Sequence, residues 1–297
     1  MPMLLCVLAA LCACERPAPQ PRGPFDGEKA LGYAKAQVDF GPRVPGSPAH
    51  KAAGDWIVAR MRERADTVIE QTWTHHTAAG VDLPLRNVLA RFRPSATERV
   101  LFVTHWDSRP TSDEETDPSM RKNPVPGAND GASGVGLFVA LGDLLKATPP
   151  SVGVDLLFVD GEDYGSFDKN EDVLIGSRYF AEHLPSPSYR ILYGVLWDMI
   201  GDADLQIHQE VNSVERAPEV VSRVWQVAAD LGYRNTFIPV AREPITDDHI
   251  PLLDKGLRVI DVIDLQYPPH HTTRDTIDKI SAQSLKTVGD VAYALVK

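Results

Sequence analysis

Four nearly continuous apolar runs constrain the fold of this chain more than any other feature. They lie at Val100–Thr104, Val154–Val159, Ile191–Trp197 and Leu257–Ile263. Runs of this kind are typical of strands that helices cover on both faces. Segments with helical spacing alternate with them, at Ala132–Ala147, Ile175–Glu182, Pro218–Leu231 and Ser281–Leu295. The alternation predicts an α/β fold, a three-layer α/β/α sandwich with a mixed, mostly parallel central sheet.

Earlier segments add an edge to this sheet and a helix before it. Val68–Thr74 and Asn87–Phe92 alternate in the manner of strands, which predicts an antiparallel pair at the sheet edge. Ala49–Arg64 has helical spacing, so we predict an N-terminal helix there. The prolines and small polar residues of Glu15–Gly27 predict a flexible tether. Residues 28–297 would then form a single domain, for which the 43% hydrophobic content is ample.

The first 14 residues form an apolar stretch too short to span a bilayer, which indicates an export signal. Leu11-Cys12-Ala13-Cys14 resembles a bacterial lipobox, although no Lys or Arg precedes the apolar run. A lipobox would make Cys14 the lipidated first residue and would place the domain in the periplasm or at the cell exterior. A plain secretory peptide and an apolar terminus without a targeting role remain the alternatives. All three cysteines lie in this segment, so thiol chemistry is excluded from the rest of the chain.

The net charge of -11 disfavours nucleic acid and anionic lipid as partners, because either would require a concentrated basic face. We therefore expect membrane contact only through the lipidated terminus. We also expect a monomer.

Residue types that bind metals occur in five separated patches. These are His105-Trp106-Asp107, Asn129-Asp130-Gly131, Glu162-Asp163, Asp198 and His271. Any one patch alone would usually be a turn or a helix cap. Four of them, however, fall at or just after a predicted strand end, where ligands bind in α/β sheets. Without cysteine, the ligands must be nitrogen and oxygen atoms, which suit zinc in mixed sets of His and carboxylate. The patches together predict a zinc site.

Charge arguments support this site at three of the patches. Glu162 and Asp163 are adjacent acids that repel one another, and a cation would keep both ionised. Because their side chains diverge, one can bind metal while the other acts as a base. Asp198 ends an apolar run, where a carboxylate is costly without a cation or hydrogen bonds. His105 and Asp107 point to the same side of an extended backbone, so one can ligate a metal and the other orient its neighbour.

Five ordered motifs contain or flank these patches. They are THWDS at Thr104–Ser108, NDGASG at Asn129–Gly134, DGEDYG at Asp160–Gly165, GSRYFA at Gly176–Ala181 and HTTRDT at His271–Thr276. On these motifs the chain resembles the superfamily of zinc aminopeptidases and glutaminyl cyclases, with the M28 peptidase clan fold, from about Val38 to the C-terminus. Two more segments resemble glutaminyl-peptide cyclotransferases in particular. They are the PGSP turn within Arg43–Pro48 and the DDHIP segment within Asp247–Leu252.

The resemblance to the cyclases implies roles for individual residues. Asp130, Asp163 and His271 would bind one zinc ion. The zinc would polarise the γ-carboxamide carbonyl of an N-terminal glutamine. Glu162 would be the general acid/base, taking a proton from the attacking α-amine and passing it to departing ammonia. The implied partners are peptide or protein N-termini.

Asp198 and Asp247 would, on the same resemblance, hold the amide nitrogen and support the proton route. The aminopeptidase relatives imply an alternative with a second zinc, bound by His105 and Asp198 and bridged by Asp130. In that case Glu162 would activate a water that attacks a peptide carbonyl. The sequence retains every ligand type that this alternative requires, so both activities stay open.

The chain departs from the cyclase pattern around the substrate. The aromatic residue expected before the last histidine is His270, and the Trp expected after the acid pair is absent. Tyr164 and Phe167 are its nearest substitutes, so we predict these two residues and His270 in the substrate pocket. Asp163 replaces the commoner Glu, as in bacterial cyclase-like members, and Asp261 stands where animal cyclases have a histidine.

Other ionisable residues are predicted to lie outside the site. Asp113–Asp117 forms an acidic loop near the site entrance, and we predict that it is solvated. His249 is predicted to be structural or to support the site indirectly. The histidines predicted at the surface are His75, His76, His183 and His208.

Other functional classes have less support. The chain has neither the GxSxG elbow of a serine hydrolase nor an HExxH helix. A non-catalytic binding module on the same fold is a third possibility, but the chain retains the metal ligands and the expected base.

Overall fold

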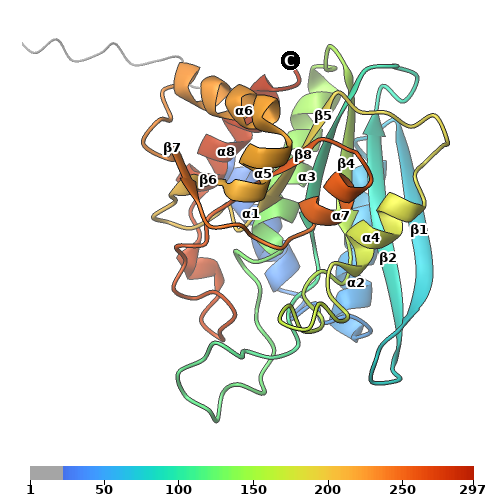
Figure 1. Cartoon of the computed structure of the whole chain (residues 1–297), viewed down its shortest axis with the longest axis vertical. Helices are drawn as coiled ribbons and strands as arrows, with labels where there is room; N and C mark the ends of the chain where they lie inside the picture. The colour runs from blue at the N-terminus through green and yellow to red at the C-terminus, as the bar shows by residue number, and fades with distance from the viewer. Residues whose placement is uncertain (1–22) are drawn as a thin grey trace, which may run out of the picture.

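The computed structural model describes residues 23–297, and its centre is a six-stranded sheet. Its strands are β1 (Thr67–His76), β2 (Asp82–Phe92), β3 (Arg99–His105), β4 (Gly153–Val159), β5 (Tyr193–Asp198) and β8 (Val259–Ile263). They lie in the order β1-β2-β4-β3-β5-β8, and Figure 1 shows β1 and β2 at one side of the molecule. β4, β3, β5 and β8 run parallel to one another, whereas β2 is antiparallel to both of its neighbours. The mixed sheet and the antiparallel pair at its edge are therefore confirmed.

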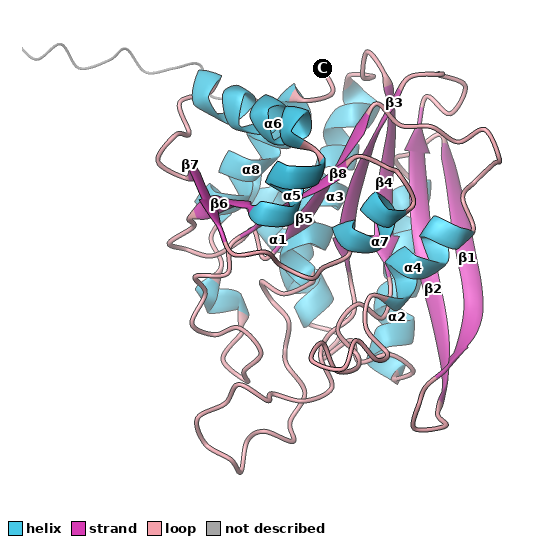
Figure 2. Cartoon of the chain, in the orientation of Figure 1, coloured by secondary structure: helices cyan, strands magenta, loops and turns pink. Residues whose placement is uncertain are grey.

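Helices cover both faces of this sheet (Figure 2). One face packs against α1 (Gly27–Val38), α2 (Pro48–Arg62), α3 (Ala132–Ala147), α6 (Pro218–Asp230) and α8 (Ala282–Ala294). The opposite face packs against α4 (Ile175–Glu182) and α7 (His249–Asp254). The remaining elements are β6 (Ile207–Glu210), α5 (Val211–Arg216), β7 (Phe237–Arg242) and a short 3-10 helix at Ile277–Lys279.

The two covered faces explain why the strands are apolar throughout. On β3, Val100 and Phe102 belong to the core under α1–α3, while Leu101 and Val103 belong to the core under α4 and α7. Because successive side chains of a strand point to opposite faces, both sets must be apolar. This is the pattern from which the sequence predicts a buried parallel strand.

The N-terminal part of the domain differs from the prediction. Helix α1 was not predicted, and the proposed tether ends before Phe25, which is buried in the core. The backbone N–H of Phe25 donates to Asp290 Oδ1 at 3.0 Å, and Asp26 caps α1. A Cβ at position 289 would come within 2.2 Å of the Phe25 ring, so glycine there makes room for the aromatic side chain. Phe25 is held by α8, which lies 265 residues away in sequence. A local sequence pattern therefore cannot predict this contact.

Several short elements were also not predicted. They are β6 and β7, which pair in a separate two-stranded sheet, and the six-residue helices α5 and α7. Elements of this length carry too few residues for a periodic signal. The proposed signal segment, Cys14 and most of the tether lie outside the described residues, so export and lipidation stay predictions. None of the helices in residues 23–297 is long and apolar enough to cross a membrane.

The burial of Phe25 predicts a large loss of stability on truncation. Phe25→Ala would leave a cavity between α1 and α8, and we expect the free energy of unfolding to fall by about 3–5 kcal/mol. Urea denaturation followed by circular dichroism measures this change. Lys29→Ala, on the exposed side of α1, is the matched control. A Phe25→Ala protein as stable as this control would show that residues 23–27 are not part of the folded domain.

Candidate metal centre and active site

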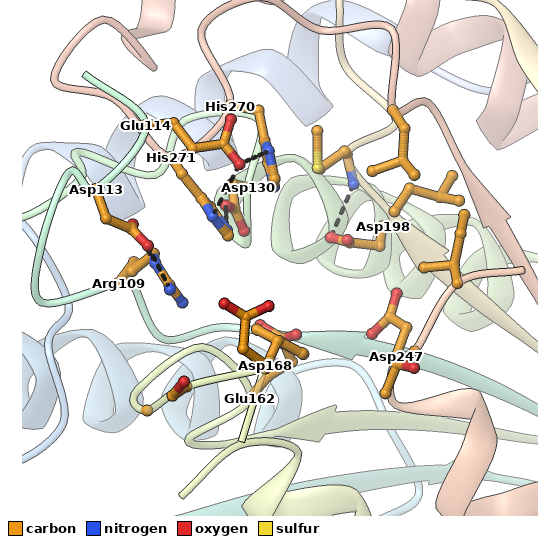
Figure 3. Close-up of a pocket in the computed structure, with 18 of the residues that line it drawn as sticks. Arg109, Asp113, Glu114, Asp130, Glu162, Asp168, Asp198, Asp247, His270 and His271 are labelled. Atoms are coloured by element: carbon orange, nitrogen blue, oxygen red, sulfur yellow. Dashed lines mark hydrogen bonds and ion pairs between the residues drawn. The ribbon is translucent and has the colours of Figure 1, made fainter. Parts of the chain in front are cut away.

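The strand ends bring the predicted patches together. His105 is the last residue of β3 and Asp198 the last of β5, and these strands are neighbours in the sheet. Glu162 and Asp163 follow β4 on the other side of β3. Asp130 lies just before α3, and His271 lies in the loop after β8. Figure 3 shows residues from these segments around one pocket.

Asp130 lies between two groups of candidate metal ligands. Its Oδ1 is 3.0 Å from His105 Nε2, which is also 3.1 Å from Asp198 Oδ1. Its Oδ2 is 3.7 Å from His271 Nε2, which is 3.4 Å from Asp163 Oδ1. The first group corresponds to the predicted second metal site and the second to the predicted first site. Each carboxylate oxygen of Asp130 thus faces a different group.

The second group fits a metal ion. Potential ligand atoms of Asp130, Asp163 and His271 all lie within 4.8 Å of one another. Asp130 Oδ2 and Asp163 Oδ2 are buried without a hydrogen-bond partner among the described residues. Buried carboxylate oxygens without donors are costly, and a cation would satisfy both of them. One imidazole and two carboxylates are a donor set suited to zinc.

A third carboxylate, Asp275, fixes the backbone at Asp130. Asp275 accepts the backbone N–H groups of Asn129 at 2.8 Å and Asp130 at 3.2 Å, and also the hydroxyl of Tyr267 at 2.6 Å. Burial, followed by the charge of Asp130, raises the pKa of Asp275 to about 6. Asp275 lies in the HTTRDT motif, but no role for it was predicted from the sequence. Its position four residues after His271 was the available signal.

Asp107 fixes the loop after β4 in a similar way. Its Oδ1 accepts the N–H of Glu162 at 3.1 Å, and its Oδ2 accepts the N–H of Asp163 at 3.2 Å. Its distance to His105 Nδ1 is 3.6 Å, beyond hydrogen-bond range. Asp107 therefore orients the acid pair through the backbone rather than the histidine ring. Asp107 was predicted to orient its neighbour His105, but it contacts the backbone of Glu162 and Asp163 instead.

Arg43, to which the sequence pattern gave no role of its own, packs against the glycine-rich loop. Its guanidinium is fully buried and donates to the carbonyl oxygens of Trp106, Pro126 and Gly127. Burial lowers its pKa to about 10. Gly131 completes this packing because its φ is 93° and a Cβ there would lie 2.7 Å from Asp107 O. Only glycine can thus stand next to Asp130 in this conformation.

The site includes backbone in a conformation that side chains seldom adopt. Met199, directly after Asp198, has φ 46°, and His271 has φ 48°. Non-glycine residues in this region cost about 1–3 kcal/mol each and cluster at functional sites. Asp198 Oδ1 accepts the Met199 N–H at 2.8 Å, which helps to hold that conformation. The strain therefore lies at one predicted ligand, His271, and at the residue that follows another, Asp198.

The candidate ligands open onto a pocket of about 550 Å³. This volume is in the usual range for small-molecule sites. Phe167 and His270 line it, as predicted. Tyr164 does not line this pocket; it packs against Leu83, Leu85 and Ile175, so its predicted place in the pocket is wrong.

The acidic loop takes part in the pocket more than predicted. Asp113 and Glu114 line it, and Glu114 lies 3.3 Å from His270 Nδ1. Glu115 is buried and accepts from the backbone and hydroxyl of Thr273, so the prediction of a solvated loop is wrong at this residue. These contacts join the loop to the segment that carries His271.

Arg109 is a further pocket residue that the sequence analysis missed. Its guanidinium donates to Asp163 Oδ1 at 2.5 Å and to both carboxylate oxygens of Asp113. It also lies over the Phe167 ring, 5.9 Å from the centroid. This arrangement occupies Oδ1 of Asp163 and leaves Oδ2 without a hydrogen-bond partner among the described residues.

Two pocket carboxyls have raised pKa values. Burial, followed by the charge of Asp163, raises the pKa of Glu162 well above its ordinary value. Burial and the charges of Asp198 and Asp248 do the same for Asp247. A raised pKa makes a carboxylate a stronger base, which favours a role in proton transfer. Glu162 lines the pocket but belongs to neither set of candidate metal ligands. Its carboxyl is therefore free to transfer protons.

The remaining histidines lie outside this pocket. His76 and His183 are exposed as predicted, whereas His75 and His208 are half-buried. His249 is buried, 3.3 Å from Glu210 Oε2, in keeping with a structural role. His50, which was not considered, is buried beside Asp160 at 2.7 Å and stacks on Trp106.

The chain is similar to known proteins in sequence and in fold. The model of peptidase family M28 matches residues 87–296. The glutaminyl-peptide cyclotransferase of Gloydius blomhoffii is 24% identical over 287 residues, covering 86% of this chain and 76% of that protein. Among solved structures, a glutaminyl cyclase from Porphyromonas gingivalis is 37% identical with a TM-score of 0.88, covering 92% of this chain and 98% of that one. A Zn-dependent exopeptidase from Parabacteroides distasonis is 34% identical with a TM-score of 0.87, covering 91% and 97%.

The hydrogen bonds from the backbone of Asn129 and Asp130 to Asp275 lead to a prediction about metal affinity. Asp275→Asn would remove an acceptor from one of the two backbone N–H groups, and we expect Zn²⁺ to bind about 10–100-fold more weakly. Competition with a fluorescent zinc chelator measures this affinity. Asp278→Asn, an exposed carboxylate three residues later, is the matched control. Unchanged zinc affinity in a folded Asp275→Asn protein would show that Asp275 does not position Asp130.

Proposed function

Because the chain belongs to peptidase family M28, we propose that it is a zinc-dependent member that acts as a glutaminyl-peptide cyclotransferase, converting N-terminal glutamine to pyroglutamate with release of ammonia. The observation that carries this choice is the position of Asp247, which lines the pocket together with Glu162 and Asp198. Figure 3 places Asp247 beside Asp198, on the side of the pocket away from His271. A ring of acids in a pocket suits a substrate with a free α-amine.

In this proposal Asp130, Asp163 and His271 hold the zinc ion, which when bound polarises the γ-carboxamide carbonyl of the substrate. Glu162 lies in the pocket with a raised pKa. It takes a proton from the α-amine as the nitrogen bonds to the carboxamide carbon, and gives it to the amide nitrogen as the bond to that nitrogen breaks. Ammonia leaves, and no water is consumed.

Asp198 and Asp247 position the substrate. Both line the pocket, and Asp247 Oδ2 has no hydrogen-bond partner among the described residues. A buried acceptor of this kind can receive an N–H of the substrate carboxamide or amine. Holding amine and carboxamide of the same residue together favours the intramolecular attack through proximity.

A second candidate function is that of a di-zinc aminopeptidase. The observation that favours it is the position of Asp130, with one oxygen toward His105 and the other toward His271. Ligand atoms of His105, Asp130 and Asp198 also lie within 4.8 Å of one another. In that case Glu162 would activate a water for attack on a peptide carbonyl. The exopeptidase from Parabacteroides distasonis keeps this candidate open.

Replacement of the proposed acid/base separates chemistry from metal binding. Glu162→Gln keeps the size of the side chain but cannot carry the proton, so we expect kcat to fall by about 10²–10⁴-fold. Zinc affinity should be retained, because Glu162 is not in the Asp130, Asp163 and His271 group. Ammonia release and product mass on a peptide with N-terminal glutamine measure the reaction. Glu171→Gln, exposed on a neighbouring loop, is the control.

The product decides between the two candidates. Loss of ammonia with the peptide bond intact identifies cyclisation. Release of a free N-terminal amino acid without cyclised product would contradict the cyclase proposal and support the aminopeptidase.

Metal stoichiometry gives an independent check. We expect chelation to abolish activity and one equivalent of Zn²⁺ per chain to restore it fully, since three ligands are enough for a catalytic zinc site. Titration of the metal-free protein with simultaneous activity and metal analysis measures this. Activity that appears only after a second equivalent would contradict the one-zinc mechanism.

A further inference from the structure

A second depression, of about 630 Å³, adjoins the active-site pocket. Phe167 and Thr246 line both, so they form a shared ridge between the two. Beyond the ridge the depression lies between α4 and α7, two helices on the same face of the sheet that Figure 1 shows near one another. We call this depression the α4–α7 groove.

The α4–α7 groove differs from the active-site pocket in charge. The pocket is lined by many acids and a single arginine, Arg109. The groove has Arg178 and Lys255 on its walls. Of its two acids, Glu182 and Asp254, the second is paired with Arg216 at 2.7 Å. A negatively charged group is therefore disfavoured in the pocket and tolerated or attracted in the groove.

The groove also offers apolar contact. Leu174 and Ala181 lie on the α4 side, and Ile250 and Pro251 lie on the α7 side. The Phe167 ring on the ridge lies under the guanidinium of Arg109, which limits its movement. An extended peptide places alternate side chains on one side, so apolar and charged positions can be read in turn.

We propose that the α4–α7 groove binds the substrate residues that follow the N-terminal one, and that it favours peptides with a carboxylate at these positions. This inference rests on one part of the proposed function, namely that the N-terminus of the substrate binds in the acidic pocket. The continuity of the two depressions across Phe167 and Thr246 gives the path of the chain. Arg178 and Lys255 provide the preference for acidic over basic peptides.

The test compares substrates of different length and charge on the full-length protein. The substrates are glutaminamide, which cannot reach the groove, and pentapeptide amides with N-terminal glutamine that carry two Glu, two Ser or two Lys at positions three and four. We expect KM to be lowest for the Glu peptide and highest for the Lys peptide. Each exposed charge pair should contribute about 2–5-fold. The order should weaken as ionic strength rises.

Reversing the charge of a groove residue tests whether the groove causes the preference for acidic peptides. Arg178→Glu and Lys255→Glu should each raise KM for the Glu peptide and lower it for the Lys peptide, with kcat little changed. The readout is the ratio of the two KM values within each variant, so a general loss of activity does not mimic it. Lys51→Glu, an exposed lysine on α2 and hence on the opposite face of the sheet, is the control and should leave the ratio unchanged.

The experiment distinguishes an error in the groove proposal from an error in the proposed reaction. Cyclisation with the same KM ratio in Arg178→Glu, Lys255→Glu and the unmodified protein would overturn the groove and leave the cyclase intact. If the N-terminal residue is hydrolysed instead, the cyclase fails, and the same ratio measured on hydrolysis still tests the groove. Without turnover, fluorescence anisotropy of a labelled Glu peptide measures binding to the unmodified and variant proteins. Equal affinities for the Glu and Lys peptides there would overturn the proposal.

Discussion

The desolvation of carboxylates at one edge of the sheet is the constraint on which the rest of this structure depends. Asp130, Glu162 and Asp163 are all buried, and each would be costly as an isolated charge. Burial and the charge of Asp130 raise the pKa of Asp163, whereas at Asp130 burial is outweighed by His105, which keeps its pKa below the ordinary value. The buried carboxylates of the site therefore require hydrogen-bond donors, protons or cations to offset the cost of their desolvation.

The surrounding side chains satisfy the hydrogen-bonding groups of the backbone, some as acceptors and one as a donor, and leave two carboxylate oxygens of the site without partners among the described residues. Asp107 and Asp275 accept the N–H groups next to the acids, and Arg43 holds the carbonyls of the adjoining loop. None of these residues occupies Asp130 Oδ2 or Asp163 Oδ2, which lack partners among the described residues. Rigid supports with unsatisfied oxygens are characteristic of sites arranged for a metal.

The sequence predicted the parts of this arrangement that depend on local pattern. Continuous apolar runs located β3, β4, β5 and β8, and the polar residues after them located His105, Glu162 and Asp198. Arg43 and Phe25 escaped notice because their contacts join segments distant in sequence, and an isolated Arg or Phe carries no periodic signal. Tyr164 was misplaced for a related reason: residues next to a functional pair can point into a core cluster instead of the pocket.

His105 is the residue at which the two candidate chemistries diverge. Its Nε2 lies within hydrogen-bond distance of both Asp130 and Asp198. While it donates a proton to either carboxylate, that nitrogen cannot ligate a second metal, since ligation requires the neutral, unprotonated atom. In the proposed cyclase reaction, the nucleophile would then be the substrate amine, with Glu162 as its base. In the aminopeptidase alternative, His105, Asp130 and Asp198 would hold a second cation, which would supply activation of a water. Whether His105 Nε2 carries a proton or ligates a metal would therefore distinguish the two proposed functions.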